Sequence, residues 1–341
     1  MSNAFSSLLN QLLDGGDLSE ADAASLMQAM ASGDVPPALG GAFLAGLRAK
    51  GVTAEEIRGF ATAMRELAVK PAIPDGTPTV DTVGTGGDGS GSLNLSTGTG
   101  LLAAACGARV VKHGNRSISS KSGSADMLEV LGMPLPLDKD AAVDALAATS
   151  FTFLFAPAFH PAMKEIMPVR GALGVRTVFN MLGPLTNPAA PPFQLIGAFS
   201  PEAARLMADT LAGMPIERAF VVHGEPGWDE ASPAGDFLLY DVTPGSVTEL
   251  KRSPEDYGVA RCAPDALKGG DAAHNAAELE RVFSGDDKGA HRDALLMGTS
   301  LVLEVMGEVA SAKAGVERAA AAIDDGSAES FLERFRTYFS T

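Results

Sequence analysis

The sequence predicts an α/β protein in which a small all-helical domain precedes a larger α/β domain with a mostly parallel central sheet flanked by helices. Residues 1–72 show apolar spacings typical of helices and contain no strand candidate. From Thr79 onward, short apolar runs alternate with helix-like stretches, which favours parallel strands joined by helical crossovers. We therefore expect a helical domain over 1–72 and an α/β domain over 73–341.

Four short helices are expected in the first domain. Ser19 and Thr53 each stand three residues before an acid, the spacing of a capping box, and so mark two helix starts. The third helix is rich in alanine and glycine, which allows close packing against another helix. We expect a helical segment near 161–190 to join this domain, and the domain to carry a homodimer interface. The proline-rich segment 71–78 predicts a hinge.

The α/β domain is expected to run strand, helix, strand along the chain and to close with helices alone. Thr243-Pro244-Gly245 lies between two apolar runs and predicts a hairpin over 237–250 at the edge of the sheet. The expected strands are 79–83, 109–112, 151–155, 193–199 and 218–223; the expected helices are 97–106, 122–131, 140–149, 201–213, 271–284, 287–307, 309–325 and 327–339.

The composition excludes several classes of function. A formal net charge of −16 argues against nucleic acid or an anionic membrane as a partner of the whole surface. Two cysteines are too few for a disulfide framework or a cysteine metal site. The sequence shows no secretion-signal pattern and no long apolar span, so we expect a cytoplasmic protein with no membrane partner.

An acid-free stretch stands out in this acidic chain. No Asp or Glu lies between Asp88 and Asp126, although 42 acids in 341 residues would place about four or five in a window of that length. A basic, glycine-rich and hydroxyl-rich stretch of this kind suits a phosphorylated small molecule. Its basic residues are Arg109, Lys112, His113, Arg116 and Lys121.

The segment Gly84–Gly89, called here the glycine loop, directly follows the first expected strand. Its letters match the dinucleotide pattern G-x-G-x-x-G, but that site needs a helix at the glycines and an acid about twenty residues on. Here Ser90–Ser92 prolong the loop, and the next strand ends in Lys112 and His113. We therefore expect a phosphate cradle at this loop, with a purely structural turn as the simpler alternative.

The loop Lys112–Ser120 combines an ammonium group, a guanidinium group, an amide and several hydroxyls. These groups suit a diphosphate and a sugar phosphate. A solvated basic loop is the alternative, and His113 taken alone could equally be a hydrogen-bonded histidine at a strand end.

Six motifs in order along the chain resemble those of the anthranilate phosphoribosyltransferases of tryptophan biosynthesis. The resemblance covers most of the chain, and the basic loop and the segment Asn180–Pro188 are long enough to be specific. Related pyrimidine nucleoside phosphorylases share the architecture but carry a different lysine-serine-arginine pattern at the basic loop. The motifs are Gly84–Gly89, Asn94–Thr97, Lys112–Asp126, Phe153–Pro157 with His160-Pro161, Met167–Arg170 followed by Arg176–Pro188, and Val221–Gly224 with Asp229-Glu230.

The resemblance implies transfer of the phosphoribosyl group of phosphoribosyl pyrophosphate (PRPP) to anthranilate, with release of pyrophosphate. It implies Asn115, His160, Arg170 and Gly84 as anthranilate-binding residues, and it leaves every general-base role open. The residues implied for PRPP are Gly84, Gly87, Asp88, Ser92, Asn94, Leu95, Ser96, Thr97, Lys112, His113, Gly114, Asn115, Arg116, Ser117, Ile118, Ser119, Ser120 and Ser124.

The resemblance also implies Mg²⁺ as cofactor, with two ions held by Ser96, Asp229 and Glu230. Carboxylates plus substrate phosphates are the usual ligands of this ion. An Asp-Glu pair is common on protein surfaces, but this pair follows an expected strand at its carboxyl end, where α/β proteins place their ligands.

The open alternatives are a pyrimidine nucleoside phosphorylase, a phosphoribosyltransferase for another aromatic amine, and a non-catalytic nucleic-acid binder. The chain also departs from the usual motifs of the resembled family. Ser92 stands in place of threonine and Leu95 in place of isoleucine. Glu225–Trp228 replaces the usual residues before the acidic pair, which places the only tryptophan beside it.

Overall fold

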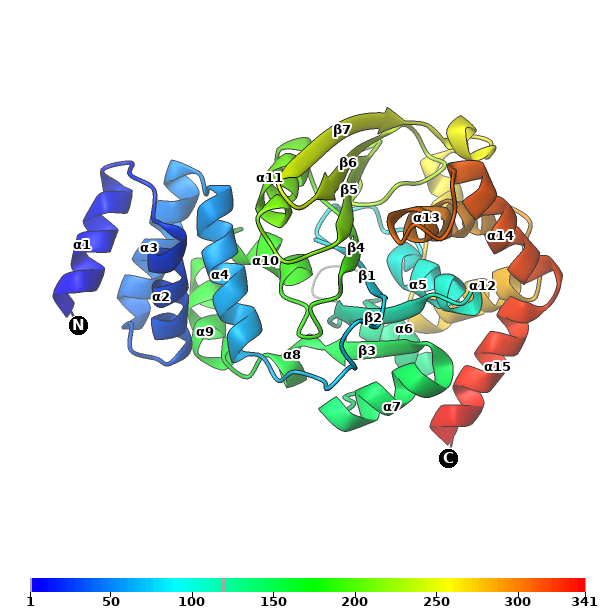
Figure 1. The fold of residues 1–341 in the computed structure, drawn as a ribbon, viewed down its shortest axis with the longest axis horizontal. Helices are drawn as coiled ribbons and strands as arrows, with labels where there is room; N and C mark the ends of the chain where they lie inside the picture. The colour runs from blue at the N-terminus through cyan, green and yellow to red at the C-terminus, as the bar shows by residue number, and fades with distance from the viewer. Residues whose placement is uncertain (1, 118–120, 341) are drawn as a thin grey trace.

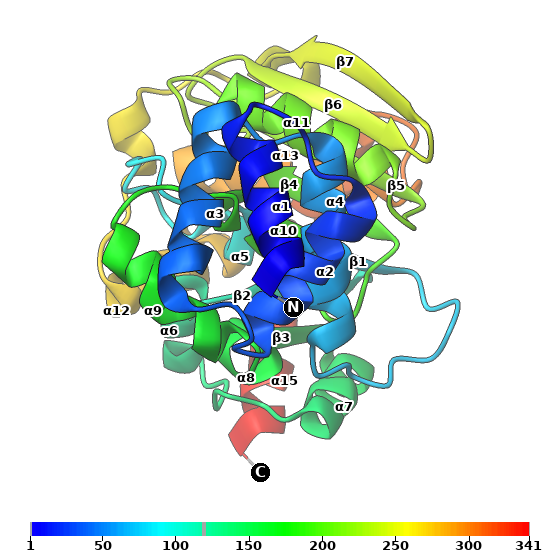
Figure 2. The same cartoon turned by 90° about the vertical axis from the view of Figure 1, so that its left-hand side faces the viewer.

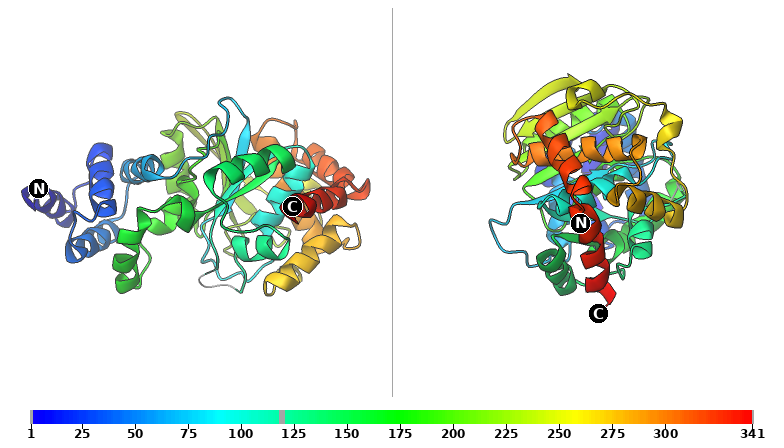
Figure 3. Two further views of the ribbon diagram at one scale, coloured as in Figure 1. Left: turned by 90° about the horizontal axis from the view of Figure 1, so that it is seen from below. Right: turned by 90° about the vertical axis from the view of Figure 1, so that its right-hand side faces the viewer.

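The computed structural model describes residues 2–117 and 121–340, and it confirms the predicted fold class. A central sheet lies between α1–α4 at one end of an elongated molecule and α12–α15 at the other (Figure 1, Figure 3). Figure 2 shows the same molecule from the end formed by the N-terminal helices.

The four expected N-terminal helices are confirmed, and their starts are capped as predicted. Ser19 Oγ accepts a hydrogen bond from the Asp22 amide at 3.1 Å. Thr53 and Glu56 exchange both bonds of a capping box, at 3.3 and 2.8 Å. The helices are α1 (Ser2–Leu13), α2 (Glu20–Ala31), α3 (Pro37–Lys50) and α4 (Ala54–Leu67).

The sheet has seven strands in the order β3-β2-β1-β4-β5-β6-β7. The first five are parallel, and β6 and β7 extend the edge as the predicted antiparallel hairpin. β4 ends two residues earlier than expected, because Ser200 caps the next helix. The strands are β1 (Thr79–Gly84), β2 (Arg109–Gly114), β3 (Phe151–Phe155), β4 (Phe193–Gly197), β5 (Arg218–Gly224), β6 (Phe237–Thr243) and β7 (Ser246–Arg252).

The eight helices that the sequence located individually in the larger domain are confirmed, with ends shifted by up to three residues. The segment expected near 161–190 contains two helices, Met163–Leu173 and Phe179–Leu185, and the short helix Ala156–Phe159 was not predicted. Two short 3-10 turns, Pro254–Tyr257 and Pro264–Leu267, precede the closing helices. The helices are α5 (Leu95–Ala105), α6 (Ser124–Val130), α7 (Lys139–Thr149), α8 (Ala156–Phe159), α9 (Met163–Leu173), α10 (Phe179–Leu185), α11 (Pro201–Ala212), α12 (Ala272–Phe283), α13 (Ala290–Val305), α14 (Ala312–Asp324) and α15 (Ser327–Ser340).

Two apolar cores lie on opposite faces of the sheet, because alternate side chains of a strand point to opposite faces. Phe220 and Val222 of β5 belong to the core that α5–α7 and α12–α15 cover. Ala219 and Val221 belong to a second core, in which α2–α4 pack together with α9, α10 and α11. The N-terminal helices therefore share one core with the sheet and with segments far along the chain. Among the described residues, no helix is long and apolar enough to cross a membrane.

Candidate active site

The loops that follow β1 and β5 meet at the carboxyl edge of the sheet. Gly84 and Gly197 end β1 and β4, and both lie against Asp229; a Cβ on either glycine would collide with it. Only glycine leaves room for this approach. The two strand ends thus bring the predicted acidic pair, Asp229 and Glu230, to the base of the glycine loop.

Asp229 is hydrogen-bonded into the glycine loop. Its Oδ2 accepts a bond from the Gly86 amide at 2.6 Å and a longer one from Thr85 Oγ1 at 3.4 Å. Its own amide donates to Asp88 Oδ2 at 3.3 Å. Burial, reinforced by the charge of Asp88, raises the pKa of the Asp229 carboxyl above its usual range. A cation at this position would relieve that cost.

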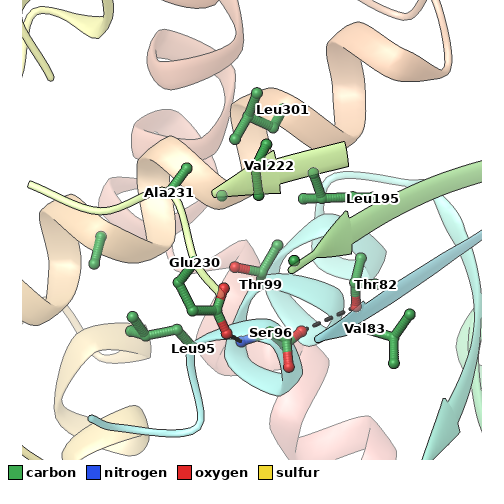
Figure 4. Close-up of a pocket in the computed structure, with 13 residues that line it drawn as sticks. Thr82, Val83, Leu95, Ser96, Thr99, Leu195, Val222, Glu230, Ala231 and Leu301 are labelled. Atoms are coloured by element: carbon green, nitrogen blue, oxygen red, sulfur yellow. Dashed lines mark hydrogen bonds between the residues drawn. The ribbon is translucent and has the colours of Figure 1, made fainter. Parts of the chain in front are cut away.

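Glu230 reaches the start of α5. The Ser96 amide donates to Glu230 Oε1 at 3.2 Å, and Thr82 Oγ1 donates to the Ser96 carbonyl at 2.9 Å (Figure 4). The Ser96 amide at the first turn of α5 is therefore occupied by a carboxylate and is not free for a phosphate. Burial of the carboxyl and the neighbouring Asp229 raise the pKa of Glu230 well above its usual range. The cavity shown in Figure 4 encloses about 20 Å³, room for a water and not for a sugar phosphate.

Lys112 lies beneath these carboxylates and does not face solvent. Only 1% of the residue is exposed, and its Nζ donates to the Thr82 carbonyl and, at 3.3 Å, to Ser96 Oγ. Burial lowers the pKa of Lys112, while Asp81, Glu230 and Asp229 oppose that shift. The ammonium group thus serves as an internal counter-ion. Arg109, counted with it in the sequence, lies at the opposite end of β2.

The donor set here fits Mg²⁺. Asp88, Asp229, Glu230 and Ser96 offer hard oxygen ligands around one buried ammonium group. Among the described residues, ligand atoms of the three carboxylates Asp88, Asp229 and Glu230 do not all lie within 4.8 Å of one another, so these acids alone do not form a closed cage. Mg²⁺ usually binds in such an open way, through one or two carboxylates plus substrate phosphates.

A second group of possible ligands, Glu278, Asp287 and His291, joins α12 to the start of α13. Arg281 pairs with Glu278 at 3.3 Å, and Asp287 Oδ1 accepts the Gly289 amide at 2.7 Å. These local bonds are enough to explain why the three side chains lie together at the junction of the two helices.

The glycine loop is fixed by its own polar residues and is open on its outer side. Asp88 Oδ1 accepts bonds from the amide and the hydroxyl of Ser90, at 3.1 and 3.0 Å. Ser92 Oγ lies 3.2 Å from Ser90 Oγ. Gly86 and Gly87 are exposed and have φ of +69° and +72°, the left-handed region that favours glycine. The loop thus presents an accessible backbone surface to a ligand.

The other residues predicted for PRPP surround this loop to different depths. Asn94 Oδ1 accepts bonds from Ser122 and Asn275, at 3.0 and 2.7 Å. Thr97 Oγ1 donates to Ser124 Oγ at 3.0 Å and is buried. Leu95 is a core residue whose side chain is 3% exposed. Only the less buried members of this set offer their side chains to the site.

The basic loop beyond β2 is held by acids of α6. Arg116 pairs with Asp126 at 3.0 Å and with Glu129 at 2.5 Å, and the Ser117 amide donates to Asp126 at 3.2 Å. Asn115 Oδ1 accepts the Arg116 amide at 2.7 Å. Gly114 ends β2 beside this loop. The predicted contacts Ile118, Ser119 and Ser120 lie outside the described residues.

Two buried histidines lie on the other side of the β2 end. The rings of His113 and His160 meet edge to face with centroids 5.0 Å apart. Burial lowers the pKa of His113 to about 3 and that of His160 to about 4, so both are neutral near pH 7. His113 Nδ1 lies 3.3 Å from the Gly183 carbonyl, and neither Nε2 atom has a hydrogen-bond partner among the described residues. Two ring nitrogens are thus left for a ligand.

Arg170 lies on α9 with its guanidinium over the ring of Phe179, 5.0 Å from the centroid. Burial lowers the pKa of Arg170. The described residues place no carboxylate within 4.0 Å of it, and its Nη1 lies 3.9 Å from Met167 Sδ. An unpaired, half-buried guanidinium beside an aromatic ring suits a planar anion.

Sequence reasoning gave no role to two residues that the structure places at this site. Arg176 Nη2 donates to the Gly87 carbonyl at 2.7 Å, although Arg176 lay within a quoted motif. Asp81 is fully buried in β1 and accepts bonds from the His113 amide at 3.2 Å and from Asn187 Nδ2 at 2.8 Å. An acid inside an apolar strand was the available signal for Asp81. No sequence pattern indicated the contact of Arg176.

Comparison with known proteins gives the family. Residues 76–329 match the family described as "Glycosyl transferase family, a/b domain", and residues 6–68 match its "helical bundle domain". The chain is 45% identical over 340 residues to the anthranilate phosphoribosyltransferase of Parasynechococcus marenigrum, covering 100% of this chain and 97% of that one. The chain belongs to the anthranilate phosphoribosyltransferase family.

Solved members of the anthranilate phosphoribosyltransferase family share the whole fold. The enzyme of Thermus thermophilus superposes with a TM-score of 0.91 at 40% identity, covering 98% of this chain and 99% of its own. The enzyme of Saccharomyces cerevisiae, solved in complex with PRPP and Mg, gives a TM-score of 0.90 at 27% identity, covering 100% and 99%. The family resemblance predicted from the sequence is confirmed.

Proposed function

We propose that this chain transfers the phosphoribosyl group of PRPP to the amine of anthranilate, giving N-(5-phosphoribosyl)anthranilate and pyrophosphate in tryptophan biosynthesis. The observation that carries the proposal is the meeting of the glycine loop with Asp229 and Glu230 in a chain 45% identical throughout to an enzyme of that name.

PRPP binds along the glycine loop, the start of α5 and the loop after β2. The exposed backbone of Gly86 and Gly87 allows close approach of phosphate oxygens. Ser92, Asn115 and the segment Ser117–Ser120 add polar groups, while Lys112 acts from beneath through its charge. Leu95 and Thr97 contribute through the backbone and packing of α5, because their side chains are buried.

Mg²⁺ is held by Asp229, Glu230 and Ser96, with Asp88 close by, and we propose two ions. When bound, the metal neutralises charge on the departing diphosphate. The raised pKa values of Asp229 and Glu230 support this assignment. Buried carboxyl groups that are costly to ionise are expected where a bound cation compensates their negative charge.

Anthranilate binds between the β2 end and α9. Arg170 meets its carboxylate, and Phe179 beneath the guanidinium keeps that group in place. The amine lies toward Asn115 and Gly84. His160 and His113 are neutral, so neither adds charge near the ribosyl carbon. Because His113 Nδ1 donates to the Gly183 carbonyl, its Nε2 is left as a hydrogen-bond acceptor.

The chain's contribution to the reaction is positioning and charge stabilisation. The ribosyl carbon becomes cation-like as the diphosphate leaves, so the amine of a correctly placed anthranilate attacks with little activation. Buried carboxylates near that carbon favour the positive charge. No side chain is assigned as general base.

The assembly proposed here is a cytoplasmic homodimer formed through the N-terminal helices. Leu13 on α1 supports this, because 65% of its side chain is exposed in the single chain. The domain division remains 1–72, joined by the segment near 161–190, and 73–341. Packing of α9 and α10 with α2–α4 in one core supports it.

Loss of anthranilate fluorescence tests the activity. Purified protein with PRPP, Mg²⁺ and anthranilate should consume anthranilate, and chelation of the metal should stop it. No consumption in the presence of metal would contradict the proposal. Parallel assays with thymidine or uridine plus inorganic phosphate, and with other aromatic amines, distinguish the related enzyme activities.

A further inference from the structure

We infer that Arg176 is a PRPP-binding residue, the guanidinium that compensates a phosphate group lying on the glycine loop. This inference rests on the proposed function and adds a residue to the site. It follows from which of the positively charged side chains near that loop are already paired in the folded protein.

The two cations that the sequence nominates for PRPP are already engaged. Lys112 is buried beneath Asp229 and Glu230, where its charge serves the carboxylates and its Nζ is bonded to Thr82 and Ser96. The guanidinium of Arg116 is hydrogen-bonded to the carboxylates of Asp126 and Glu129. The glycine loop itself contributes a negative charge at Asp88. A phosphate on this loop therefore needs another cation.

Arg176 lies at the glycine loop, where such a cation is needed. Its Nη2 donates to the Gly87 carbonyl at 2.7 Å, and no other lysine or arginine side chain among the described residues is hydrogen-bonded to the glycine loop. Its guanidinium lies over the ring of Phe199, 4.5 Å from the centroid. The ring leaves the edge of the guanidinium, which carries the N–H groups, free for an anion.

The charge of Arg176 has no carboxylate partner among the residues that the structure describes. Within the described residues, no carboxylate lies within 4.0 Å of it, unlike Arg116, Arg205 and Arg218, which all form ion pairs. Arg176 is also exposed, and Gly87 beside it is exposed. A guanidinium has five N–H donors, so one can hold Gly87 while others reach a phosphate oxygen.

The backbone of Arg176 is fixed from the N-terminal helices. Arg48 Nη1 on α3 donates to the Arg176 carbonyl at 2.8 Å. The neighbouring Thr177 amide donates to Asn180 Oδ1 at 2.9 Å. The guanidinium is thus presented to the glycine loop from the opposite side of the site, by the segment that also carries Arg170.

The simpler explanation is that Arg176 only tethers Gly87. A tether needs a hydrogen-bond donor, whereas a phosphate contact needs the positive charge. Arg176→Gln keeps an N–H donor without charge, and Arg176→Lys keeps the charge without the fork. The two substitutions therefore separate the explanations.

The experiment is steady-state kinetics of wild type, Arg176→Ala, Arg176→Gln and Arg176→Lys, varying PRPP and anthranilate separately with Mg²⁺ saturating. Arg205→Ala, an exposed arginine paired on α11, is the matched control. We expect Arg176→Ala and Arg176→Gln to raise the KM for PRPP about 10-fold to 100-fold, the range for a lost charge-assisted hydrogen bond. Arg176→Lys should fall between them and wild type, with the KM for anthranilate within about twofold throughout.

A binding measurement separates failure of this inference from failure of the proposed function. Calorimetric titration with PRPP and Mg²⁺, without anthranilate, should show the same order of affinities among the variants. If wild type turns over but Arg176→Gln matches it, or if the KM for anthranilate alone rises, the inference is wrong. If wild type neither binds PRPP nor consumes anthranilate, the proposed function itself fails.

Discussion

The candidate site has two halves that are built in opposite ways. In the carboxylate half (Asp88, Asp229, Glu230 and Lys112), charged groups are gathered in or beside the protein interior, and each is hydrogen-bonded to the surrounding backbone or hydroxyl groups. In the histidine half (His113, His160 and Arg170), the Nε2 atoms of two neutral rings have no hydrogen-bond partner, and one guanidinium has no carboxylate partner, among the described residues. The first half carries excess negative charge, which suits a cation. The second carries unused hydrogen-bonding groups, which suit a planar acid.

Replacing both acids of the carboxylate half should give the largest effect. Asp229→Asn with Glu230→Gln preserves size and removes the proposed metal ligands, so we expect kcat to fall by about a thousandfold or more. Lys112, whose charge these carboxylates balance, stays buried in the variant, so circular dichroism must first show that the variant is folded. Steady-state kinetics on the same sample then tests the effect, and retained activity would contradict the assignment.

Removing the arginine of the histidine half should act on one substrate. Arg170→Ala should raise the KM for anthranilate by about 10-fold to 100-fold, because a bidentate contact to a carboxylate is lost. The KM for PRPP should stay within about twofold. An unchanged KM for anthranilate would refute the carboxylate role, and Arg205→Ala serves as the control for an exposed arginine.

The buried histidines should also make the stability of the protein depend on pH. The pKa of His160 is lowered to about 4, so an unfolded chain gains a proton below about pH 6.5 that the folded chain does not accept. Stability should therefore fall as the pH drops from about 6.5 to 4, by up to about 3 kcal/mol from this residue. His160→Gln should flatten the difference in denaturant unfolding between pH 7 and pH 4. Parallel curves for the two proteins would show that His160 is not held neutral.

The smallest effect is expected at the ion pair outside both halves. Arg116 and Glu129 are 45% and 33% exposed, so water screens their attraction. Glu129→Gln should change the free energy of unfolding by less than about 1 kcal/mol. Urea unfolding measures this, and a loss several times larger would mean that the pair organises the loop more strongly than its exposure suggests.

The sequence predicted the fold better than it predicted which groups of the candidate site are free. The predicted strands and helices were confirmed because apolar periodicity and helix caps such as Thr53 are local properties of the sequence. Asp229 was placed correctly at a strand end for the same reason. The engagement of Lys112 and the contact of Arg176 with Gly87 depend on residues 16 to 89 positions away, so no local pattern could indicate them.

The core that α2–α4 share with α9, α10 and α11 sets an order of events during synthesis. The N-terminal helices leave the ribosome first, but Met207 and Leu211 of α11, which complete that core, follow well over a hundred residues later. At ordinary elongation rates the wait is on the order of ten seconds. During it, the part of α4 that packs against α11 is uncovered on the nascent chain. A ribosome stalled before α11 would therefore present a natural substrate for a chaperone.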